Sequence, residues 1–112
     1  MADAIEAINV LGFALDAIQQ RQQVIANNIA NENTPGYQAQ VVTFENSLAN
    51  AVANGGTATA TVSPEGLPSS SDGNNVSLPA ELALESQTNL ENQSVADSLN
   101  AQFAILSAAV SG

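Results

Sequence analysis

Residues 26–37 read ANNIANENTPGY and mark the point where a long helical pattern stops. Because Thr34 precedes a proline, its backbone is pushed out of the α region, so we expect the helix to end near residues 31–33. The following four residues fit a tight turn, in which Pro35 sets φ at the second position and Gly36 supplies a positive φ at the third. By spacing alone, the plainest interpretation is an ordinary helix exit followed by a turn.

Residues 3–32 carry an apolar pattern that advances in alternating steps of three and four. This pattern predicts an amphipathic helix about 45 Å long, with Gln22 as the one polar member of its seam. The apolar seam positions are Ile8, Leu11, Leu15, Ile18, Ile25 and Ile29. Such a seam fits the core of a two-helix hairpin and also a coiled-coil layer between subunits, and the two interpretations are compatible.

A second long helix is predicted near the end of the sequence, with Ser77 as its N-cap and Pro79 in its first turn. Its second half is the more apolar. The residues expected there in the hairpin core are Leu99, Phe103, Leu106 and Val110. In an antiparallel hairpin, this apolar half would lie beside the beginning of the first helix, and the asparagines of both helices would gather at the opposite end.

The fold class that we predict is all-α, with two long terminal helices forming an antiparallel coiled-coil hairpin in one structural domain. Residues 1–33 form the N-terminal helix and residues 77–112 the C-terminal helix. Residues 34–56 hold the turn, an extended segment and a short helix capped by Thr43. Small polar residues, glycines and prolines predict a flexible linker at residues 57–76.

Charge and composition exclude several classes of function. Eleven acidic residues stand against one basic residue, Arg21, which gives a formal net charge of -10. Nucleic acid is not an expected partner, because phosphate binding needs clustered basic residues. Without His, Cys or Lys the common catalytic bases and nucleophiles are missing, so we expect no enzyme activity, no small-molecule substrate, no cofactor and no metal site.

The sequence also bears on targeting and on self-sufficiency. No apolar run is long enough to span a bilayer and no basic leader opens the chain, so neither membrane insertion nor a cleavable signal peptide is expected. Aromatic residues make up 4% of the chain. Two helices with so few large side chains bury little surface between them, so we expect the chain to become fully helical only on assembly.

Two motifs resemble the N-terminal signature of bacterial flagellar rod, hook and hook-associated proteins: NNIAN at residues 27–31 and TPGY at residues 34–37. The segment DGNNV at residues 72–76 resembles the lead into the C-terminal helix of rod proteins, and the final helix looks most like that of proximal rod proteins. The residues that carry the family motif, with an implied role in assembly, are Arg21, Asn27, Asn28, Ile29, Ala30, Asn31, Thr34, Pro35, Gly36 and Tyr37. The sequence leaves open whether the motif asparagines bond within the hairpin or between subunits.

The resemblance implies a structural subunit of the proximal rod of the flagellar basal body. Such a subunit assembles helically with other copies of itself and with other rod proteins, transmits torque and helps to form the export channel. Contacts with export-gate and basal-body ring components are implied, as is a place in the cell envelope and periplasm, reached by type III export without signal cleavage. The alternatives are a C-type rod or other axial protein, and a small acidic helical adaptor or export chaperone.

Overall fold

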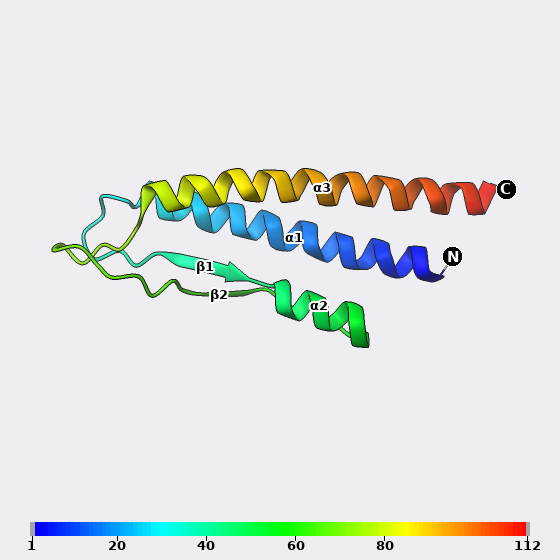
Figure 1. Cartoon of the computed structure of the whole chain (residues 1–112), viewed down its shortest axis with the longest axis horizontal. Helices are drawn as coiled ribbons and strands as arrows, with labels where there is room; N and C mark the ends of the chain where they lie inside the picture. Colours follow the sequence, from blue (N-terminus) through cyan, green and yellow to red (C-terminus); the bar gives the residue numbers. More distant parts are fainter. Residues whose placement is uncertain (1, 112) are drawn as a thin grey trace.

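In the computed structural model, which describes residues 2–111, two long helices run side by side along the molecule (Figure 1). They are α1 (Ala2–Ala30) and α3 (Leu78–Ser111), and both termini lie at the same end. The predicted predominance of helix and the two long elements are therefore confirmed. Residues 1 and 112, which the prediction placed in these helices, lie outside the described residues, and coiled-coil packing of the pair stays a prediction.

The end of α1 follows the turn chemistry of its sequence. The helix stops at Ala30, close to the predicted range. The Tyr37 N–H donates to the Thr34 carbonyl at 3.2 Å, and Gly36 has a φ of 77°. The predicted tight turn is thus confirmed, with glycine at the position that needs a positive φ.

A small antiparallel sheet lies on the side of α1 away from α3 (Figure 1). Strand β1 (Gln40–Thr43) pairs with β2 (Thr61–Pro64). The all-α class is right for the helices but missed this sheet. Strand β2 falls inside the predicted linker. Its β-branched Thr61 and Val62 favour an extended backbone, and pairing with β1 fixes it as a strand. Pro64 is tolerated because β2 is an edge strand.

Helix α2 (Glu45–Asn54) follows β1 directly. Its N-cap residue is Phe44, which makes no side-chain capping hydrogen bond, so the predicted cap by Thr43 is wrong. Thr43 is instead the last residue of β1, where its backbone is extended. Gly55 ends the helix with a φ of 76° and donates its N–H to the Ala51 carbonyl at 2.9 Å.

The best-buried apolar cluster lies between α1 and the segment that joins β1 to α2. Its buried members are Ala17, Ile18, Val42 and Phe44, with Val95 of α3 packed against it. The apolar core therefore lies on both sides of α1, and the seam between α1 and α3 holds only part of it.

The predicted hairpin core is partly right. Ile18 and Ile25 are buried, whereas the half-buried residues are Ile8, Leu11, Leu15, Ile29, Leu99 and Leu106. Phe103 and Val110 are 49% and 73% exposed, so their placement in the core of the chain is wrong.

The stripe of α3 that faces the rest of the molecule explains this error. Its buried and half-buried residues recur every seven positions, at Glu81, Thr88, Val95 and Gln102. Phe103 follows Gln102 and is therefore turned about 100° around the helix from this stripe. The polar contacts at the start of α3 set its rotation, and its most apolar side chains are left facing outward.

Candidate functional site

Four polar residues are buried or nearly so at the closed end of the molecule, the end opposite the two termini. Asn28 is 1% exposed, Glu81 2%, and Asn74 and Asn75 5% each. Together with Tyr37, which is half-buried, we call them the polar joint. They come from the last turns of α1, from the turn after it, and from the entry into α3.

Asn28 is the centre of the polar joint. Its amide nitrogen donates to the Gln40 carbonyl at 2.8 Å and to Glu81 Oε1 at 3.1 Å. Its amide oxygen accepts from the Tyr37 hydroxyl and from the Gln40 N–H, each at 3.1 Å. Both donors and both acceptor positions of the amide are thus satisfied within the chain. The question left open by the sequence is answered for this residue.

Asn74 binds the turn that follows α1. Its amide donates to the carbonyls of Asn31 and Thr34, each at 2.8 Å, and its amide oxygen accepts from the Val76 N–H at 2.8 Å. The last carbonyls of α1 itself are satisfied locally, by the N–H groups of residues 31 and 32. Asn74 adds donors to this turn from forty or more residues further along the chain.

Asn75 joins the same loop to β1. Its amide oxygen accepts from the Ala39 N–H at 2.6 Å, and its amide nitrogen donates to the Leu67 carbonyl at 3.0 Å. Close by, the Gly36 N–H donates to the Asp72 carbonyl at 2.9 Å. A Cβ at Gly73, whose φ is 85°, would lie 3.3 Å from the Gly36 Cα, so the two loops approach each other where both carry glycine.

The remaining motif residues lie around the joint rather than in it. The Asn31 amide donates to the Asn27 carbonyl at 2.8 Å and its oxygen accepts from the Thr34 hydroxyl at 3.0 Å. Asn27, Ala30 and Pro35 are exposed, and Ile29 is half-buried. Of the three motif asparagines, the structure therefore buries only Asn28.

Arg21 lies to one side of the polar joint and is 8% exposed. It donates to the Val42 carbonyl at 2.7 Å, pairs with the Glu45 carboxylate, and stands 4.6 Å from the centre of the Phe44 ring. Glu91 of α3 is 3.8 Å away. The one basic side chain of the sequence thus ties α1 to the start of α2 and is not available to a partner.

Glu81 is a buried member of the joint whose carboxylate is only partly hydrogen-bonded. Its Oε1 accepts from Asn28, but its Oε2 is buried without a partner, as is Oε2 of Glu65. Burial raises the pKa of the Glu81 carboxyl, and the negative charge of Glu65 raises it further, while the Asn28 hydrogen bond lowers it. The ionised Glu81 carboxylate therefore destabilises the folded chain, and protonation of Glu81 removes this destabilisation.

The geometry of the joint is that of a clamp between chain segments, because its polar groups bond to one another. Within residues 2–111 no helix has the length and apolar character needed to cross a membrane. In the same range, no group of three or more acidic side chains is placed to hold a metal ion. Sequence reasoning did not give Asn74, Asn75 and Glu81 these roles, since their partners are distant in the sequence; the only signal was the DGNN loop before the final helix.

Comparison with known proteins gives one matching family model, described as "Flagella basal body rod protein", over residues 8–38. This range covers most of α1 and runs through the turn into the polar joint.

Several relatives carry the name "Flagellar basal body rod protein FlgB". The protein of Escherichia coli K12 is 42% identical over 65 residues, which cover 55% of this chain and 46% of that protein. The protein of Aeromonas hydrophila is 28% identical over 124 aligned residues, covering 96% of this chain and 94% of the relative. That of Borrelia hermsii is 50% identical over 40 residues, or 36% of this chain and 30% of the relative. The chain thus matches about half the length of its Escherichia coli relative.

Proposed function

We propose that the chain, which is similar to flagellar basal body rod proteins and carries the NNIAN and TPGY motifs, is a structural subunit of the proximal rod. One observation carries the proposal. The residues matched by the family model, 8–38, cover most of α1 and the turn that the polar joint binds. The part shared with the family is therefore the part that sets how the two long helices meet.

As a rod subunit, the chain assembles with copies of itself and with other axial proteins into a helical structure. A heterologous contact repeated by a screw operation gives an open assembly of this kind. The long helices supply extended surfaces for neighbours, and the polar joint holds their closed ends together, which suits a part that transmits torque. We further propose that the subunit helps to form the wall of an export channel and contacts export-gate and basal-body ring components. It would lie in the rod within the cell envelope, which it reaches by export without signal cleavage.

The B-type proximal rod protein is favoured over a C-type rod protein or another axial protein. The relatives described above all carry the FlgB name, and the alignment with the Aeromonas hydrophila protein runs over nearly the whole of both chains. Nothing in the comparisons favours an adaptor or an export chaperone. The rod family is one of structural proteins, and we propose no catalytic role.

Deletion of the gene and electron microscopy of isolated basal bodies test this function. We expect basal bodies without a complete rod and cells that do not swim, with both defects restored by the wild-type gene. Intact rods and normal swimming in the deletion strain would refute the proposal.

A further inference from the structure

The open end of the molecule, where both termini lie, carries an uncharged and apolar stretch of α3. Residues 98–111 contain no charged side chain. Phe103, Ile105 and Val110 are 49%, 56% and 73% exposed, and they point to more than one side of the helix. A helix with apolar residues on several sides is normally buried, so this part of α3 lacks a cover within its own chain.

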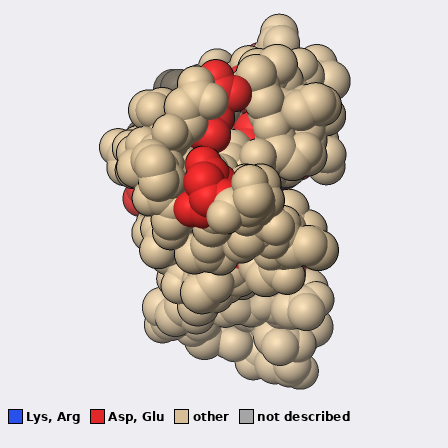
Figure 2. Space-filling view, turned by 90° about the vertical axis from the view of Figure 1, so that its left-hand side faces the viewer, with Lys and Arg blue, Asp and Glu red and all other residues tan. Residues whose placement is uncertain are grey.

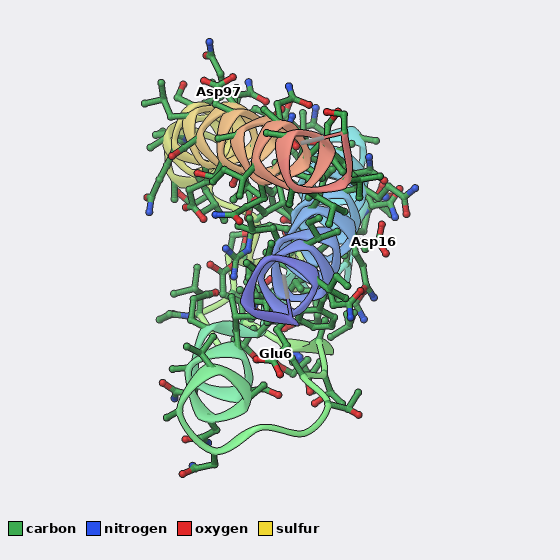
Figure 3. The ribbon with its side chains drawn as sticks, turned by 90° about the vertical axis from the view of Figure 1, so that its right-hand side faces the viewer. Glu6, Asp16 and Asp97 are labelled. Carbon is green, nitrogen blue, oxygen red and sulfur yellow. The ribbon has the colours of Figure 1, made fainter. Side chains whose placement is uncertain are left out.

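A groove of about 630 Å³ opens between the first turns of α1 and the end of α2. Its apolar walls include Val10 and Leu11 of α1 and Ala51 and Val52 of α2, and Val52 is 65% exposed. Glu6 is its one charged lining residue, on the side of α1 that faces α2 (Figure 3). The groove has the size and apolar lining of a site for side chains of a partner helix.

The charge distribution indicates which partner fits. Two copies that each carry a charge of -10 repel unless their contact surfaces lack carboxylates. The stretches 7–15, 46–64 and 98–111 are uncharged, and they supply the groove, apart from Glu6, and the end of α3. Acidic side chains gather instead on the closed end, where Figure 2 shows no basic side chain. A basic partner is drawn to that closed end, whereas the neutral surfaces at the open end suit a second copy.

The two surfaces also match in shape and cannot meet within one chain. Phe103, Leu106 and Val110 are spaced i, i+3 and i+7, which is the spacing of side chains that anchor a helix in a groove. The α3 helix of the same chain lies on the other side of α1 from α2 (Figures 1 and 3). The end of α3 can therefore fill this groove only on another molecule.

We propose that the face of α3 formed by Phe103, Leu106 and Val110 docks into the groove between α1 and α2 of a second copy. The contact is heterologous, because it joins two different surfaces, and its repetition leads to an open assembly rather than a closed dimer. The inference rests on the proposed function and deepens it, since it names the surfaces through which neighbouring rod subunits meet.

Cysteine cross-linking tests the contact, because the chain has no cysteine of its own. Val52→Cys places a thiol on the groove and Val110→Cys places one on α3. We expect an oxidised mixture of the two variants to give at least ten times more disulfide-linked dimer than either variant alone, and the double variant to give a ladder of oligomers. The matched control pairs Val110→Cys with Asn27→Cys, at the closed end, which should stay at the background level.

A charge substitution supplies a second readout. Phe103→Asp should lower the cross-link yield at least tenfold, whereas Ile105→Asp, about 200° further around α3, should leave most of it. Circular dichroism shows whether each variant stays helical. The inference is wrong if the mixture gives no more dimer than the control pair, if Val52→Cys links mainly to itself or to a different protein, or if the two Asp variants behave alike.

The outcome can be separated from that of the proposed function. Single-cysteine genes that restore swimming under reducing conditions support the rod function, whatever the cross-linking shows. Restored swimming without the expected cross-link would therefore overturn only the docking surface. Intact rods in the deletion strain would overturn the proposed function itself.

Discussion

Replacing Asn28 by leucine tests the polar joint most directly. The substitution keeps the approximate size of the side chain but removes four hydrogen bonds, to the Gln40 backbone, the Tyr37 hydroxyl and the Glu81 carboxylate. Because all of these partners belong to the same chain, we expect Asn28→Leu to weaken the fold itself and not only assembly.

The expected loss follows from what each partner is left with. Glu81 is 2% exposed, and without Asn28 neither of its carboxylate oxygens keeps a partner, which costs about 2–3 kcal/mol. Gln40 is exposed and Tyr37 half-buried, so water replaces much of their bonding and adds only about 1 kcal/mol. The free energy of unfolding should fall by about 3–4 kcal/mol in total, or about 2 M in the urea midpoint at a typical slope.

Urea unfolding followed by circular dichroism measures this loss, at a protein concentration where the helicity of the wild type no longer changes. Asn27→Leu is the matched control, because the Asn27 side chain is exposed, and it should change the stability by less than about 0.5 kcal/mol. Equal midpoints for Asn28→Leu and the wild type would refute the reasoning. They would show that the joint contributes nothing to the single chain and would return Asn28 to a role between subunits.

Three further substitutions test other features. Glu81→Gln should raise the stability at pH 7, because burial and Glu65 raise the carboxyl pKa above 4.5 in the folded state. In the wild type, protonation of Glu81 contributes its whole stabilisation below the unfolded pKa, and this contribution is lost as pH rises through the folded pKa. The stability advantage of the variant should therefore vanish in acid. An advantage that grows in acid would contradict this. Gly73→Ala should lower the free energy of unfolding by about 1–2 kcal/mol, since φ is 85° and the added Cβ would lie 3.3 Å from the Gly36 Cα. Gly12→Ala, inside α1 with nothing within 4 Å of the added Cβ, should raise stability by about 1 kcal/mol, and shifts of the same sign in the two alanine variants would be inconsistent with the structure.

Sequence patterns among neighbouring residues correctly predicted the parts of the fold that depend on neighbouring residues. The period of α1, the tight turn with Gly36 and the start of α3 after Ser77 all follow from residues close in sequence. Strand β2 was missed because the β-branched Thr61 and Val62 lie within a segment rich in Gly, Pro and Ser, and the partner strand β1 is distant in sequence. The rotation of α3 could not be predicted either, because the buried face of α3 carries Glu81 and Thr88 in place of the apolar residues that a seam is expected to contain.

Only some residues of the polar joint could be predicted from the sequence. Asn28 lies in a recognisable motif, yet its burial depends on β1 and α3, and the turn after α1 is bound by Asn74 from within the predicted linker. The turn after α1 and the loop before α3 hydrogen-bond to each other, so neither has all of its partners until both are in place. The end of α1 and the entry into α3 therefore form one cooperative unit. The open end has no such internal partners for Phe103 and Val110, so the chain completes its closed end by itself and depends on a neighbour for its open end.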